Sequence, residues 1–204
     1  LQPRDVERDR RELTIRATLV SLLGSVEGYG SSKLADAQRR AVALAEARGF
    51  ELLPPLLRSI AILSLTRGDF TSAAAPGERL RARADRDRDP VLLVEAEYVL
   101  GITAFWRGNL AQARQHFEEA VARYSAEHRA THLVHYGQDP KVICLSRLAN
   151  TLWLLGEFEE AWQAADTALA LANEIGHLHT RATALTFATL LAIEARDDDR
   201  VRTC

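Results

Sequence analysis

The sequence predicts an all-α protein: an α-α superhelix of helical hairpin repeats, with about 4.5 units along the chain. Three observations lead to this fold class. A short glycine-containing motif recurs, the segments on both sides of each copy are apolar at helical spacing, and no window alternates with period two between hairpin turns. The elements are therefore expected to be about nine helices and no sheet.

The composition is that of a folded globular chain. Of its 204 residues, 47% are apolar and 26% are charged, and the formal net charge is −2. A charge this close to zero gives no general attraction to nucleic acid or to anionic lipid. No segment approaches the roughly 20 apolar residues of a membrane span. The presence of only two cysteines favours a reducing, cytoplasmic location. Because the chain contains no methionine, we expect it to be a segment of a larger protein.

The motif reads glycine, a polar residue, a large apolar residue, two free positions and alanine. It occurs at 68–73, 108–113 and 156–161, with a weaker copy at 30–37 that has two extra residues in the turn. Glycine just past a helix supplies the left-handed conformation that ends it. The small alanine then allows the returning helix to approach closely, so each copy marks a helix–turn–helix unit.

Helix starts are marked by proline. Asp89-Pro90 and Asp139-Pro140 place a capping carboxylate before a first-turn proline, and 54–55 is a pair of prolines. The resulting units span approximately 10–48, 52–86, 90–127, 139–175 and, as a partial unit, 178–204. Pro76 conflicts with a helix that starts at 71, because it would clash with the preceding turn. We expect either a kink or a later start there.

The repeat resembles the tetratricopeptide repeat (TPR). Its small and bulky positions match Gly101, Ala113, Phe117 and Ala120. Units of about 40 residues exceed the usual 34, and are similar to the longer-helix variety of bacterial multidomain signalling ATPases. The sequence segments 27–30, 100–106, 136–145 and 152–156 also resemble that group. Its members include adenylate or guanylate cyclase-linked proteins and LuxR-type transcriptional regulators. The resemblance implies an ATPase module outside this segment.

In this family the first helix of each hairpin lines a concave inner face. The resemblance therefore implies a binding groove lined by eight candidate residues: Arg58, Tyr98, Ile102, Phe105, Trp106, Ser146, Asn150 and Trp153. A peptide, a protein or a neighbouring domain would occupy this groove, and a small-molecule inducer is an alternative occupant. Trp106 and Trp153 could instead simply fill gaps between hairpins.

A metal site is the competing hypothesis. His128, His132 and His135 would share one face of a continuous helix and could bind zinc or nickel, although no acidic residue at helical spacing would orient their rings. His116 is expected on a solvated helix face. No nucleophile motif, phosphate-binding loop or buried pair of carboxylates is evident. We therefore expect a non-catalytic scaffold without a cofactor, and no direct contact with nucleic acid or membrane.

Overall fold

The computed structural model describes residues 3–203, and every regular element in that range is helical. The elements are α1 (Pro3–Glu27), α2 (Ser32–Arg48), α3 (Pro54–Thr66), α4 (Ala74–Asp87), α5 (Pro90–Trp106), α6 (Leu110–Arg123), the 3-10 helix η1 (Ala126–His128), α7 (Arg129–Tyr136), α8 (Pro140–Leu155), α9 (Phe158–Ile175), α10 (Leu178–Glu194) and α11 (Asp198–Thr203). The all-α prediction is confirmed. The helices outnumber the expectation because the connection after α6 itself folds into η1 and α7, and because the short helix α11 follows α10.

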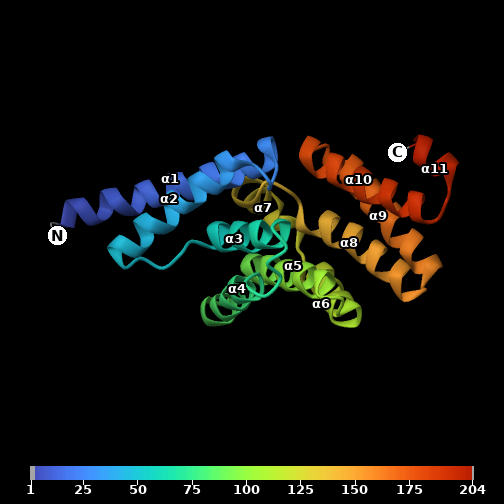
Figure 1. Ribbon diagram of the computed structural model, residues 1–204, viewed down its shortest axis with the longest axis horizontal. Helices are drawn as coiled ribbons and strands as arrows, with labels where there is room; N and C mark the ends of the chain where they lie inside the picture. The colour runs from blue at the N-terminus through green and yellow to red at the C-terminus, as the bar shows by residue number, and fades with distance from the viewer. Residues whose placement is uncertain (1–2, 204) are drawn as a thin grey trace.

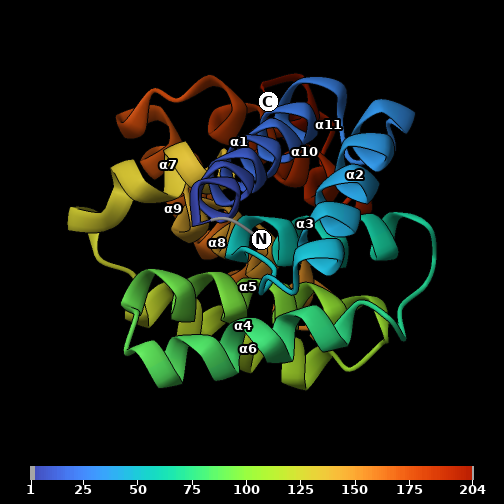
Figure 2. The ribbon, with the colours of Figure 1, turned by 90° about the vertical axis from the view of Figure 1, so that its left-hand side faces the viewer.

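Helices that follow one another pack as hairpins: α1 with α2, α3 with α4, α5 with α6, and α8 with α9. Each second helix also packs on the next hairpin, and the first helices α1, α3, α5, α8 and α10 contact one another in succession. The array runs from α1 and α2 at one end to α10 and α11 at the other (Figure 1). Figure 2 looks along it from the α1–α2 end. None of the described helices has the length and apolar character of a bilayer span.

The three strong motif copies form the same turn. Gly68, Gly108 and Gly156 have φ of 75°, 79° and 85°. In each copy the glycine N–H and the next residue's N–H donate to carbonyls of the helix just ended, at 2.9–3.0 Å. The left-handed glycine expected from the sequence is confirmed at these positions. In the weaker copy, Gly28 (φ 81°) takes this conformation and Gly30 does not.

The predicted helix starts are also present. Asp89 accepts a hydrogen bond from the N–H of Leu92 at 3.0 Å, and Asp139 accepts one from Val142 at 3.1 Å. The prolines that follow these caps occupy the first turns of α5 and α8. The late start expected around Pro76 is confirmed, since α4 begins at Ala74 and has the proline in its first turn.

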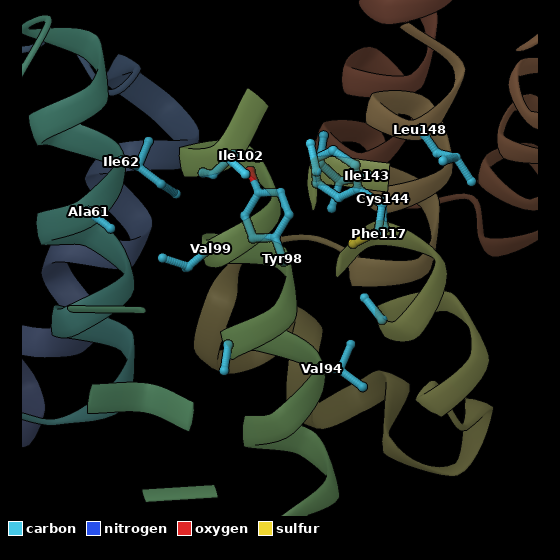
Figure 3. Close-up of a cluster of buried hydrophobic side chains, with 14 of the residues drawn as sticks. Ala61, Ile62, Val94, Tyr98, Val99, Ile102, Phe117, Ile143, Cys144 and Leu148 are labelled. Carbon is cyan, nitrogen blue, oxygen red and sulfur yellow. The ribbon is translucent and has the colours of Figure 1, made fainter. Parts of the chain in front are cut away.

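The core depends on very small residues where helices cross. Ala113, Phe117 and Ala120 on α6 are fully buried. A Cβ added to Gly101 on α5 would lie 2.5 Å from the Phe117 ring, so only glycine admits this crossing. One continuous cluster of buried side chains extends from α3 to α10, and Figure 3 shows the part contributed by α3, α5, α6 and α8.

We expect Gly101→Ala to destabilise the protein by about 1–3 kcal/mol, because the fully buried Phe117 ring would have to shift to admit the new methyl group. Urea unfolding followed by circular dichroism measures the change. Gly30→Ala is the matched control, because nothing lies within 4 Å of a Cβ added there. Equal stability of the two variants would show that the α5–α6 crossing is looser than described.

Candidate functional site

The eight residues predicted to line the groove lie on three first helices, α3, α5 and α8. Four of them, Arg58, Tyr98, Ile102 and Ser146, are at most 4% exposed. Phe105, Asn150 and Trp153 are half-buried, and Trp106 is 48% exposed. The expected open groove is therefore largely closed around the first four residues. The physical reason is that the first helices pack against one another and against an additional helix.

That additional helix is α7, which follows η1 in the long connection between α6 and α8 (Figure 1). It contacts α1, and the Ser21 hydroxyl of α1 donates a hydrogen bond to the carbonyl of His135 at 2.9 Å. Gly137, which ends α7 with φ 75°, lies so close to Ser25 that a Cβ would collide with its hydroxyl. The connection between two hairpins is thus fastened to the first helix of the chain.

A buried ionic network holds α7 against α3 and α5. Arg58 Nε lies 2.9 Å from Glu95 Oε2, and Glu95 Oε1 is hydrogen-bonded to His132 Nδ1 at 2.8 Å. A second nitrogen of Arg58 donates to the carbonyl of Tyr136 at 3.2 Å and to the hydroxyl of Tyr29 at 3.3 Å. Arg58, Glu95 and His132 are all at most 4% exposed. The network therefore links α3, α5 and α7 in the interior.

The Arg58 guanidinium also lies 4.9 Å from the centre of the Tyr98 ring. Burial opposes its charged form, but Tyr29, Glu95 and Tyr98 outweigh this and raise the pKa of Arg58 above its ordinary value. A buried charge is tolerated only when it is paired and hydrogen-bonded. Arg58 thus stabilises the junction of α3, α5 and α7.

Buried carboxylates were not expected from the sequence, yet Glu95 and Glu97 are each 1% exposed. Glu97 pairs with Arg81 of α4 and accepts a hydrogen bond from His116 Nδ1 of α6 at 2.7 Å. His116 is therefore half-buried and bonded instead of solvated. The sequence did contain a signal for these buried carboxylates, because two acidic residues interrupt the long apolar segment of α5. An unpaired charge there would be costly, so buried partners could have been expected.

The histidines of the metal hypothesis do not share one continuous helix. His128 ends η1, whereas His132 and His135 belong to α7. His132 is buried against Glu95, and His135 is exposed. Within residues 3–203, no group of three His, Cys, Asp or Glu side chains is placed to hold a metal ion.

The base of the connection is fixed by Tyr124 and Asp139. The Tyr124 hydroxyl donates to Asp139 Oδ2 at 2.5 Å and accepts from Arg129 at 3.2 Å. Burial, together with the bond to Asp139, raises the pKa of Tyr124 to about 12. Asp139 is fully buried and also caps α8. One carboxylate therefore closes the connection and starts the next hairpin.

Beyond α7, the first-helix face retains a hollow of about 100 Å3. It is lined by Ile62, Leu65 and Thr66 of α3, by Tyr98, Ile102 and Trp106 of α5, and by Arg147 of α8. Three of the predicted groove residues, Tyr98, Ile102 and Trp106, thus meet here. Arg147 was not predicted, although a cation within the apolar sequence of α8 was a visible signal.

A second cavity, of about 350 Å3, lies at the other end of the first helices. Its walls come from α1, α3, α5 and α7 and from the turns before α3 and α5, and include Ala17, Pro54, Asp89, Val91 and His135. This volume is within the range of small-molecule pockets. The α7 connection therefore covers part of the first-helix face and at the same time helps to form a cavity.

Comparison of the sequence with models of known protein families gives no match, and comparison with curated proteins gives none either.

We expect Glu95→Gln to destabilise the protein by about 3–5 kcal/mol, because it leaves the buried Arg58 guanidinium without a counter-charge. Denaturant unfolding measures the loss. Glu118→Gln removes a carboxylate from an exposed pair with Arg114, and should cost no more than about 0.5 kcal/mol. A similar small change for both variants would contradict the role given to the network.

Tyr124 predicts a pH dependence in the alkaline range. Its folded-state pKa of about 12 lies above the ordinary value of 10.0, so the folded state retains the proton more strongly. The stabilisation is complete below pH 10 and is lost as pH rises toward 12. Unfolding free energy measured at several pH values should fall less steeply in Tyr124→Phe than in the unaltered protein. Parallel curves would be inconsistent with the Tyr124–Asp139 bond.

Proposed function

We propose that this chain is a non-catalytic, TPR-like helical-repeat scaffold, forming a right-handed superhelix that binds a peptide, a protein or a neighbouring domain. In this proposal it is the interaction arm of a bacterial cytoplasmic signalling or transcription-regulating ATPase. Binding on the first-helix face would bias the state of the attached output domain. The resemblance described above supplies this context.

The order of helix contacts supports the repeat assignment. Each of the first helices α3, α5 and α8 packs on its own partner, on the second helix before it and on the next first helix. This nearest-neighbour arrangement is typical of stacked repeats, in which a single hairpin cannot bury its apolar face alone. The first helices α3, α5 and α8 share one surface, because residues of all three line the same hollow.

Trp106 is the observation that carries the interaction proposal. It lies at the end of α5 on the rim of the hollow and is 48% exposed. Phe70 lies parallel to its ring at 6.3 Å, and Phe105 meets it edge-on at 5.6 Å. A tryptophan that is braced on its neighbours and still accessible is a typical anchor for a partner, because little conformational freedom is lost on binding.

The α7 connection limits where a partner can bind. Its residue Tyr136 covers the first-helix face at Arg58. No residue of α7 lines the hollow beside Trp106. Partner binding is therefore assigned to the end of the first helices next to the glycine turns.

The test begins with photo-crosslinking in the source cell from position 106, with Gln115 on the exposed face of α6 as the control position. The protein captured only from position 106 is then purified and titrated against this chain. Trp106→Ala should weaken binding at least about tenfold and lower Tm by no more than about 4 °C. Unaltered affinity, or no complex between the purified proteins, would refute the assignment.

The cavity of about 350 Å3 favours a second candidate function, sensing of a small-molecule inducer by the same type of regulator. Its walls combine apolar side chains with the Asp89 carboxylate and the His135 ring. Few polar groups on an apolar wall are the usual composition of such a pocket. An inducer bound there would contact α1 and α7 together, and so would act on the fastening between them.

A further inference from the structure

Arg147 differs from Arg58 in one decisive respect. Both arginines lie on first helices, but Arg58 has Glu95 as its counter-charge. The Nε atoms of both arginines are shielded from solvent and lack a well-aligned hydrogen bond, but in the part of the chain that the structure describes the Arg147 side chain has neither an ion pair nor any other hydrogen bond. A shielded guanidinium nitrogen that lacks an acceptor is rare in proteins and calls for a specific explanation.

The surroundings of Arg147 are aromatic and apolar. Phe187 of α10 covers one face of the guanidinium, with Cζ 4.2 Å from the ring centre. Arg147 also lines the hollow with Tyr98, Ile102 and Trp106. Arg147 is half-buried, and this burial lowers its pKa because the charged form loses part of its hydration. The site therefore has a positive charge without the anion that would compensate it.

We propose that the hollow is an anion site that binds a carboxylate on a short aliphatic stem, either a free organic acid or the side chain of a glutamate in a peptide. The planar fork of a guanidinium matches the two oxygens of a carboxylate. The apolar wall of Ile62 and Ile102 suits the stem.

Size and donor number select this ligand over larger or more highly charged anions. Because a cavity of roughly 150 Å3 holds the six carbons of benzene, about 100 Å3 holds the carboxylate and the first one or two carbons of its stem. A phosphate carries more charge and needs more donors. The only hydroxyl on the wall besides that of Tyr98 is that of Thr66, which already donates to the Leu63 carbonyl at 2.8 Å.

This inference goes beyond the scaffold function, because binding of a small acid needs no protein partner. The hollow could fail to bind a carboxylate while the Trp106 surface still binds a protein. Equally, the hollow could bind a carboxylate while the Trp106 surface binds no protein. The two results are separable because the experiment below uses only the purified chain and small probes.

The test is calorimetric titration with sodium butyrate, with butyramide as the uncharged analogue. We expect saturable butyrate binding with Kd of about 1 mM and no saturable butyramide binding. Arg147→Gln should weaken butyrate binding at least about tenfold. Arg107→Gln changes the net charge equally at an exposed position beside Trp106, and should leave Kd within about twofold.

A second probe, N-acetyl-glutamate methylamide, separates the two sources of the carboxylate. Binding of both probes assigns the site to a peptide side chain, and binding of butyrate alone assigns it to a free acid. Inorganic phosphate that binds more tightly than butyrate would overturn the carboxylate assignment. If neither carboxylate probe shows saturable binding, or if Arg147→Gln binds butyrate as tightly as the unaltered protein, the site itself is overturned.

Two measurements keep the test valid if the variant is perturbed. Arg147→Gln should have a Tm equal to or above that of the unaltered chain, because it removes an uncompensated charge. If it fails to fold, the indole N–H resonance of Trp106 in the unaltered protein decides. That resonance, assigned by its loss in Trp106→Phe, should shift with butyrate and saturate at the calorimetric Kd; no shift would refute the site.

Discussion

The array depends on the close approach of helices at positions that lack a side chain. Gly101 admits the ring of Phe117 between α5 and α6, and Gly77 similarly meets Leu100 between α4 and α5. Without these approaches, the alanines of α6 could not be fully enclosed. Since interiors are packed to crystal-like density, a wider spacing could not be filled by small adjustments elsewhere. The spacing of α5 from its two neighbours, α4 and α6, follows from these few positions.

The α7 connection changes what this face can do. It brings His132 to Glu95 and the Tyr136 carbonyl to Arg58, so that the interior half of the face is occupied by the chain itself. Two arginines on the same face consequently differ in role. Arg58 is neutralised from within, whereas Arg147 lies in a hollow that no residue of α7 lines, with the Phe187 ring on one face of its guanidinium and no carboxylate paired with it among the described residues. A carboxylate from outside would complete the second site as Glu95 completes the first.

The sequence predicts the local features well and the pairing of distant groups poorly. Glycine turns such as Gly108, and the Asp139-Pro140 start of α8, are encoded within a few residues, so both could be predicted. The link from His132 to Glu95 spans 37 residues and depends on how α7 folds back. Tyr98 was expected to face an open groove; α5 is buried on nearly all sides, so helical periodicity could not distinguish its exposed face.

The fastening of α1 to α7 has a consequence for how the array comes apart. Stacked repeats with only neighbour contacts fray from their ends, because each terminal unit is held by one interface. Here the bond between Ser21 and the His135 carbonyl joins residues 114 positions apart, and the fit of Gly137 against Ser25 reinforces it. The first three hairpins and the connection thus form one cooperative block. By contrast, α10 packs mainly on α8, α9 and the short α11, so we expect local opening to begin at this end of the described chain.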